Sequence, residues 1–278
     1  MKKTMLLTAG VAFILLSGLG SLSIHQAHAQ VPVTTKNFSA PIVFQAAGPS
    51  AASIQESVAQ YRIALGEPNN GNNASKESGR REINWDGAAN NLDTAVSGNP
   101  LSTFLVTRGA LFSTPDGSGF VQATPAGLAS FFNNPTYGTI FKAFSQFRLF
   151  SAIGGHITDV DFFVPGGNTI PATTKGFGAV FTDVDQPDGS GPGEKLGNRH
   201  ASTLIEYFGR DGELLFSSFV PASPGNGGQS FFGVVFSDAR IARVRIISGN
   251  VISGLNDDGI QDVVVMDDFL YAEPKSAN

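Results

Sequence analysis

Two acidic stretches carry residue types that could bind a hard cation. The first, GAVFTDVDQPDGSG (residues 178–191), places Asp183, Asp185 and Asp188 within six positions, directly after an apolar run. An EF-hand loop takes calcium ligands from positions 1, 3 and 5 and from a glutamate at position 12. With Asp183 at position 1, Glu194 stands at position 12, but the third aspartate comes one residue late and the stretch follows a predicted strand. We therefore favour a polar turn, which Asp and Gly readily form, over a metal site, and the role of Asp183 and Asp185 at the end of the predicted strand stays open.

The second acidic stretch, NDDGIQDVVVMDDFLY, lies near the C-terminus and comes closer to a calcium-binding pattern. Asn256, Asp258 and Asp262 have the spacing i, i+2, i+6, although Gly254 stands where the pattern has its first ligand. Because calcium takes about six to eight oxygen ligands, these three side chains need others to complete a site.

Asp267 and Asp268, in the predicted last strand, could supply those further oxygens. Two adjacent carboxylates repel each other unless a cation or hydrogen bonds compensate their charge. Pairing of the two with Arg243 and Arg245, on a predicted neighbouring strand, is an alternative that stays open. The predicted metal site, with structural Ca²⁺ as its ion, comprises Asn256, Asp258, Asp262, Asp267 and Asp268.

The sequence offers little for catalysis by a nucleophile or by zinc. It has no cysteine and no G-x-S-x-G motif. His156 and His200 are the only histidines after residue 30, fewer than a zinc site needs. A glycoside hydrolase needs two facing carboxylates, for which Glu82, Asp86 and Glu206 are candidates by residue type alone. We assign no catalytic residue from the sequence.

Sugar binding without catalysis uses exposed aromatic rings beside polar groups. Trp85, the only tryptophan, and Tyr207 are the predicted ligand-binding rings, with Glu206 beside the latter. The 23 phenylalanines far outnumber the other aromatic residues, and phenylalanine mostly fills cores. We therefore expect one small sugar site rather than a long cleft. The charges around Trp85 in GRREINWDG are expected to form surface ion pairs.

The N-terminus has the features of a secretory signal peptide. Lys2 and Lys3 precede an apolar run, and Ala27 and Ala29 form a small-x-small cleavage site, so we expect residues 1–30 to be removed on export. We expect the protein to be secreted, into the periplasm or the extracellular space, with no membrane insertion after this removal. Cleavage takes two of 18 basic residues and none of 23 acidic ones, which leaves a net charge of −7. That charge argues against nucleic-acid partners.

Hydrophobic spacing predicts one short helix near the start of the mature chain. Ile54, Val58, Tyr61 and Leu65 recur at helical spacing, which predicts an amphipathic helix over residues 51–65. Ser53, three residues before a glutamate, resembles a capping box. We interpret residues 31–78 as an extended lead-in, this helix and a linker.

From residue 79 the apolar pattern changes to period two and to short apolar runs. About ten predicted strands separated by turn signals indicate an all-β, jelly-roll-type two-sheet sandwich over residues 79–274. They include TIFKAFSQFRLF (residues 139–150) and the two strands of a hairpin at GRDG. Residues 275–278 form a C-terminal tail. Without cysteine, the domain must rely on core burial or a bound ion for its stability.

Several motifs together resemble an uncharacterised family of exported bacterial proteins. They include YRIALGEPNNGN, GRREINWDG, FSTPDGSGF, ITDVDFFVPG, GFGAVFTDVD, FFGVVFSDARIARVRIISGN and DVVVMDDFLYAEP. The resemblance extends from about Tyr61 to Pro274 and implies a jelly-roll, lectin-like β-sandwich. Many such proteins resemble PEP-CTERM proteins, but this sequence stops at YAEPKSAN without an apolar anchor. The family has no assigned activity, so the resemblance implies fold and compartment only.

The sequence therefore predicts a secreted, non-catalytic binding module. A carbohydrate is the expected ligand, and a glycan or cell-surface polymer is the expected partner. One alternative is a structural protein of the cell surface or matrix, since the charge-poor, phenylalanine-rich composition suits that role equally. A second alternative is a secreted glycan-active enzyme that uses a carboxylate pair. Two facing carboxylates with a flanking aromatic ring would favour the enzyme, and aromatic rings alone the binding module.

Overall fold

The computed structural model of this chain describes residues 39–87, 93–167, 169–185, 203–258 and 260–277. The predicted signal peptide, Asp188, Glu194 and His200 lie outside these residues. Among the described residues, no helix combines the length and the apolar character needed to cross a membrane. The helices are α1 (Ala51–Leu65), α2 (Leu105–Arg108), α3 (Pro125–Phe131) and α4 (Tyr137–Ile140).

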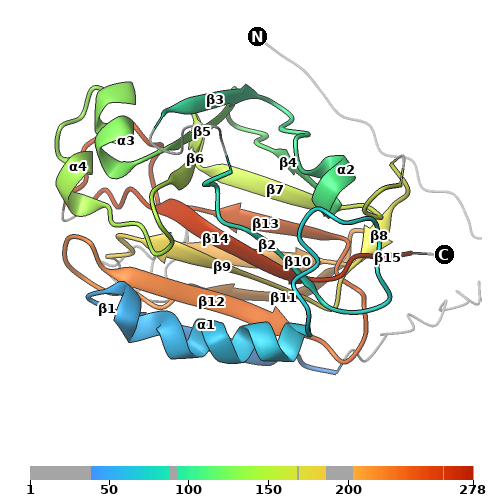
Figure 1. Ribbon diagram of the computed structural model, residues 1–278. Coiled ribbons are helices and arrows are strands. Elements are labelled where there is room, and N and C mark those ends of the chain that lie inside the picture. Colours follow the sequence, from blue (N-terminus) through green and yellow to red (C-terminus); the bar gives the residue numbers. More distant parts are fainter. Residues whose placement is uncertain (1–38, 88–92, 168, 186–202, 259, 278) are drawn as a thin grey trace, which may run out of the picture. The chain divides into compact units, whose positions relative to one another are not determined.

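The chain is mostly β-structure (Figure 1). The strands are β1 (Ile42–Gly48), β2 (Arg80–Ile83), β3 (Ala95–Gly98), β4 (Ala110–Ser113), β5 (Gly119–Ala123), β6 (Leu149–Ile153), β7 (Ile157–Phe162), β8 (Ala172–Thr173), β9 (Gly176–Thr182), β10 (Leu204–Phe208), β11 (Leu214–Phe219), β12 (Gln229–Val235), β13 (Arg243–Ile247), β14 (Val265–Ala272) and β15 (Lys275–Ser276).

These strands form two large antiparallel sheets and one small pair. The larger sheet has the order β1-β12-β9-β14-β6-β5-β3, with β2 also paired to β14. The smaller sheet has the order β11-β10-β13-β7-β4, and β15 pairs with β8. Strands β10 and β11 form the predicted hairpin, with Gly212 at its turn in the left-handed region. The predicted two-sheet, all-β character is confirmed.

The main core lies between the two sheets and is rich in phenylalanine. It joins side chains of the larger sheet, such as Phe177 and Phe269, to side chains of the smaller one, such as Val160 and Ile246. The buried phenylalanines of this core are Phe112, Phe120, Phe150, Phe162, Phe177, Phe181, Phe232, Phe236 and Phe269. Their number explains the composition, because aromatic rings bury large apolar areas without any need for disulfides.

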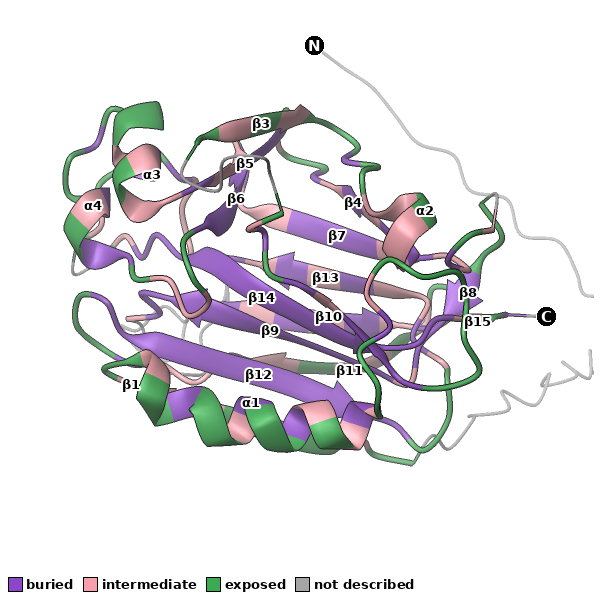
Figure 2. Ribbon diagram, viewed as in Figure 1, coloured by how far each residue is buried: buried purple, intermediate pink, exposed green. Residues whose placement is uncertain are grey.

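The larger sheet is covered on both faces. Helix α1 packs on the face opposite the main core and buries Ile54, Val58, Tyr61 and Leu65, which confirms the predicted helix and its apolar side. Helices α3 and α4 cover another part of the same sheet. Strands β9, β12 and β14 are consequently buried along their whole length (Figure 2), which accounts for the apolar runs within β9 and β12. The predicted capping box at Ser53 is wrong, because α1 begins at Ala51.

A pair of glycines lets α1 approach this sheet closely. Gly178 of β9 and Gly233 of β12 stand opposite each other, and the Tyr61 ring lies over both. A Cβ atom at Gly178 would lie 2.9 Å from the Tyr61 ring, and one at Gly233 would lie 2.8 Å from it. The Tyr61 hydroxyl donates to the Val234 carbonyl at 3.1 Å. Tyr61 therefore packs its ring on the two glycines and also forms a hydrogen bond to the backbone of β12.

Several elements differ from the sequence-based prediction. The expected lead-in contains β1, which pairs with β12 along its whole length, so the sandwich begins before residue 79. The expected tail contributes β15. The predicted strand over residues 139–150 is instead the end of α4, a loop and the start of β6. Helix α3 has a local signal that the prediction missed: Thr124 accepts a bond from the Gly127 amide, and proline follows it at the first helical position.

Candidate functional site

The candidate site lies where β14 changes partners along one edge. The first part of β14 pairs with β6 through Met266, and the second part pairs with β2 from Phe269 onward. Between these two residues the register against β9 shifts, which places Asp267 and Asp268 in a β-bulge. A bulge locally disrupts the ladder and redirects side chains, a common feature beside functional sites.

A polar cavity of about 660 Å³ opens beside this bulge, and we call it the forked cleft. It is larger than the cavity of about 320 Å³ at the end of α1 and the cavity of about 290 Å³ beside Trp85. Helix α1, strand β2, the segment that follows α4 and strand β14 all contribute to its walls. The lining side chains used below are Arg62, Glu82, Asn84, Phe144, Ser145 and Asp268.

Arg62 brings two carboxylates together in the forked cleft. Its Nη2 lies 2.9 Å from Glu82 Oε2 and 3.4 Å from Asp268 Oδ2, so both carboxylates face the same guanidinium group. Glu82 also accepts a bond of 2.6 Å from Arg80 Nε. The cleft therefore contains a positive group between two negative ones, with one carboxylate held by two arginines.

The adjacent Asp267 is buried behind the cleft wall. Its Oδ2 accepts the Phe144 amide at 2.6 Å, and its Oδ1 accepts the Ser145 hydroxyl at 2.9 Å. Burial, followed by the charge of Asp268, holds the pKa of Asp267 well above its usual range, and burial also raises the pKa of Asp268. The two carboxyl groups therefore retain a proton at pH values where an exposed pair would be fully ionised. Among the described residues, the buried Asp268 Oδ1 has no hydrogen-bond partner, and a proton shared with Asp267 would satisfy it.

Replacing Asp267 by asparagine is expected to flatten the pH dependence of stability. Since the folded-state pKa is raised, the wild-type folded chain keeps a proton that the unfolded chain releases. Asp267 alone should therefore lower stability by up to about 1.4 kcal/mol per pH unit as pH rises above about 4, and the fall of stability with pH should be less steep by this amount in Asp267→Asn. Urea unfolding from pH 4 to 8 checks this, and equal slopes in both proteins would contradict it.

The predicted ligand-binding rings are core residues, so the prediction of an exposed aromatic platform is wrong for both. Trp85 is 1% exposed, stacks on Phe150 with ring centroids 3.8 Å apart, and donates from Nε1 to the Asp267 carbonyl at 2.7 Å. Tyr207 is 0% exposed and donates from its hydroxyl to the Phe177 carbonyl at 3.2 Å. Neither ring has a free face on which a sugar could stack.

Glu206 lies away from the forked cleft, on the outer side of the smaller sheet. It stands opposite Arg245 of β13, which forms a bidentate ion pair with Asp159 at 2.7 Å. Arg243 of the same strand lies over the Phe208 ring. Because β13 and β14 belong to different sheets, the predicted pairing of these arginines with Asp267 and Asp268 is wrong.

The five residues of the predicted metal site are divided among separate environments. Asn256 is exposed, and Asp258 accepts the backbone amides of Ile260 and Gln261 within its own loop. Asp267 and Asp268 belong to the bulge described above. Within the described ranges, no three His, Cys, Asp or Glu side chains are already arranged as a set of metal ligands. The five residues therefore do not form one site among the described residues.

Arg62 and Phe144 are among the contributors to the forked cleft that were not predicted from the sequence. Arg62 is the only basic residue of α1, and this could have marked it as a candidate site residue. Phe144, half-buried beside Asp267, lies in a segment that was predicted to be a strand and gave no separate signal. The sequence analysis did single out the two carboxylates of the cleft, Asp268 as a metal ligand and Glu82 by its residue type alone.

No family model, curated protein or solved structure matches this chain. The function is therefore argued from the forked cleft.

Proposed function

We propose that this chain is a secreted, jelly-roll-type, lectin-like binding module whose carbohydrate ligand occupies the forked cleft. The observation that carries the proposal is the cleft itself, which offers both donors and acceptors at close spacing. Arg62 and Asn84 carry N–H donors, whereas Glu82 and Asp268 carry acceptor oxygens. Sugar hydroxyls donate and accept at once, so they match such a mixed lining.

Phe144 supports the choice of a sugar over a small ion. It is half-buried in the cleft wall, and its ring would offer an apolar surface to the C–H face of a pyranose. The volume of about 660 Å³ is in the range of ordinary small-molecule sites. A single cleft of this size suits a short saccharide, such as the end of a longer glycan.

Replacing Asp268 by asparagine is expected to weaken glycan binding by about 10- to 100-fold. The substitution removes a charged acceptor from the cleft and leaves Arg62 with one carboxylate instead of two, and hydrogen bonds to charged groups are worth about 1.5–3 kcal/mol. A glycan array would first identify an oligosaccharide that binds, and calorimetric titration would then give its affinity for each protein.

Glu206→Gln is the matched control, because Glu206 is a half-buried carboxylate on the other sheet. It should bind the same oligosaccharide as wild type does. Absence of any binding glycan, or equal affinities for wild type and Asp268→Asn, would contradict the proposal.

A glycan-cleaving enzyme is a second candidate, favoured by the two carboxylates that share Arg62. Asp268, whose pKa is raised by burial, would protonate the glycosidic oxygen as the C–O bond breaks, and Glu82 would assist the attack of water on the sugar carbon. Release of reducing ends by wild type, lost in both Asp268→Asn and Glu82→Gln, would establish this activity. Binding of a glycan without release of reducing ends would favour the binding module over the enzyme.

A further inference from the structure

The antiparallel pairing of β9 and β14 brings the two acidic stretches together. Thr182, the last residue of β9, stands opposite Val265, the first residue of β14. The residues that follow β9 and those that precede β14 must therefore be neighbours at one end of the larger sheet. The Asp185 amide accordingly donates to the Asp262 carboxylate, at 3.2 Å to Oδ2 and 3.4 Å to Oδ1.

Four carboxylates gather at this end, and we call them the aspartate cluster: Asp183, Asp185, Asp257 and Asp262. Three of them are anchored through one oxygen each. Asp183 Oδ1 accepts the Gly227 amide at 3.3 Å, Asp185 Oδ1 accepts the Gly225 amide at 2.8 Å, and Asp257 Oδ1 accepts the Val263 amide at 2.8 Å. Backbone donors from the loop between β11 and β12, and from the segment that precedes β14, thus orient these side chains.

Asp183 provides a separate observation that points to a bound cation. Its side chain is completely buried, and its Oδ2 has no hydrogen-bond partner within the described residues. A buried carboxylate oxygen without a partner is costly, and native proteins rarely leave one uncompensated. Among the described residues, the charged side chains that act on this carboxylate are Asp257, Asp185 and Asp262, all acidic.

The electrostatics of the aspartate cluster also favour a bound cation. Burial, followed by the neighbouring carboxylates, raises the pKa of Asp183 to about 8, and burial with Asp262, Asp185 and Asp258 raises that of Asp257 to about 7. Within the described residues, no lysine or arginine is among the groups that act on either carboxylate. Like charges held together by the fold would be compensated by a divalent ion.

We propose that the aspartate cluster binds one calcium ion, which ties the end of β9 to the loop that precedes β14. Calcium suits a set of carboxylates and carbonyl oxygens in irregular geometry, whereas magnesium demands near-octahedral ligands and retains its waters. Within the described residues the side chains are not already arranged as a ligand set, so binding requires the carboxylates of the cluster to turn toward a common centre. The site is independent of the forked cleft and of its proposed ligand.

Thermal unfolding of the full chain in excess chelator and in increasing CaCl₂ tests this site. We expect the unfolding midpoint to rise by about 5–10 °C at a calcium concentration about 100-fold above the dissociation constant. An equal concentration of MgCl₂ should shift the midpoint much less. Equilibrium dialysis with calcium should give one ion per chain.

The double variant Asp183→Asn/Asp257→Asn keeps the side-chain shapes, removes two charges and should lose the calcium-dependent shift. Asp211→Asn, in the exposed turn between β10 and β11, should keep it. If the double variant fails to fold in circular dichroism, Asp257→Asn alone replaces it, because Asp257 is only half-buried. No midpoint shift in wild type, or a shift that persists in the variant, would overturn the calcium site and leave the forked cleft unaffected.

Discussion

Replacing Glu273 by glutamine is expected to lower the free energy of unfolding by about 3–5 kcal/mol, because it leaves the buried Arg81 guanidinium without its counter-charge. Arg81 is 0% exposed, and Glu273 is also buried. For a chain of this length, such a loss corresponds to a fall in melting temperature of roughly 6–20 °C. Urea unfolding followed by Trp85 fluorescence would measure it.

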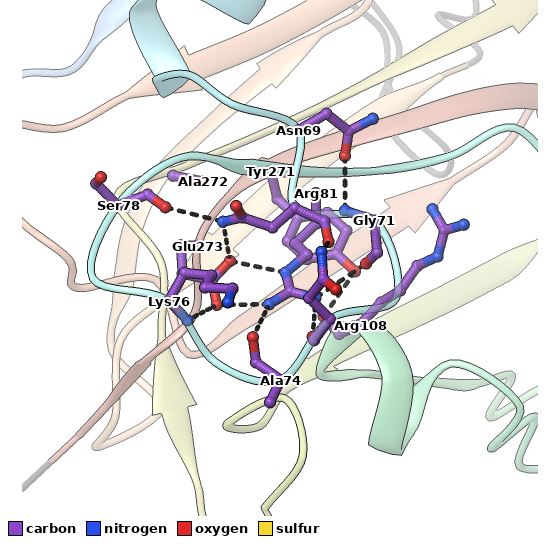
Figure 3. Close-up of polar contacts among 12 residues, drawn as sticks. Asn69, Gly71, Ala74, Lys76, Ser78, Arg81, Arg108, Tyr271, Ala272 and Glu273 are labelled. Atoms are coloured by element: carbon purple, nitrogen blue, oxygen red, sulfur yellow. Dashed lines mark hydrogen bonds and ion pairs between the residues drawn. The ribbon is translucent and has the colours of Figure 1, made fainter.

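The size of this effect follows from how completely the pair is bonded (Figure 3). Arg81 Nε and Nη2 each donate to one oxygen of Glu273 at 2.7 Å. The remaining guanidinium hydrogens go to backbone carbonyls of Gly71, Asn73, Ala74 and Thr107. The pair therefore holds the loop between α1 and β2 against the end of β14, and loss of one partner should loosen that loop as well.

Asp238→Asn is the control for this prediction. Asp238 pairs with Arg240 at the surface, where an ion pair contributes at most about 1 kcal/mol. A loss of similar size in both variants would contradict the assignment of Arg81 and Glu273 as a buried stabilising pair.

Replacing Trp85 by alanine is expected to cost about 3–5 kcal/mol, the range for removal of a large buried aromatic ring. The indole stacks on Phe150 and meets Phe104, Phe112 and Phe269 edge-on, so its loss opens a cavity in the main core. It also leaves the Asp267 carbonyl without its donor. Because Trp85 is the only tryptophan, unfolding must be followed by circular dichroism.

Trp85→Phe separates packing from hydrogen bonding. A phenyl ring can still stack on Phe150 but cannot donate to the Asp267 carbonyl, so this variant should lose less stability than the alanine variant. A change below about 1 kcal/mol in Trp85→Ala would place the indole outside the core and restore the surface-platform interpretation.

Local patterns were sufficient for much of the fold. The spacing of Ile54, Val58, Tyr61 and Leu65 predicted α1 with its bounds, because helical periodicity is visible in a single segment. Alternation and turn residues similarly located β10, β11 and the hairpin between them. Short helices such as α4 were missed, because a few residues of apolar sequence do not distinguish a helix from a strand.

Composition and local patterns were sufficient to predict the all-β class, the core-filling role of phenylalanine and the two acidic stretches. Which contacts these residues make depends on the tertiary structure. Pairing of β9 with β14 brings Asp183 and Asp262 together across almost 80 positions, and the bulge in β14 turns Asp268 toward Arg62 of a distant helix. It also decided that Trp85 and Arg81 are buried. Periodicity reports only which face of one element is apolar, whereas burial and convergence depend on which elements pair, and that pairing is non-local.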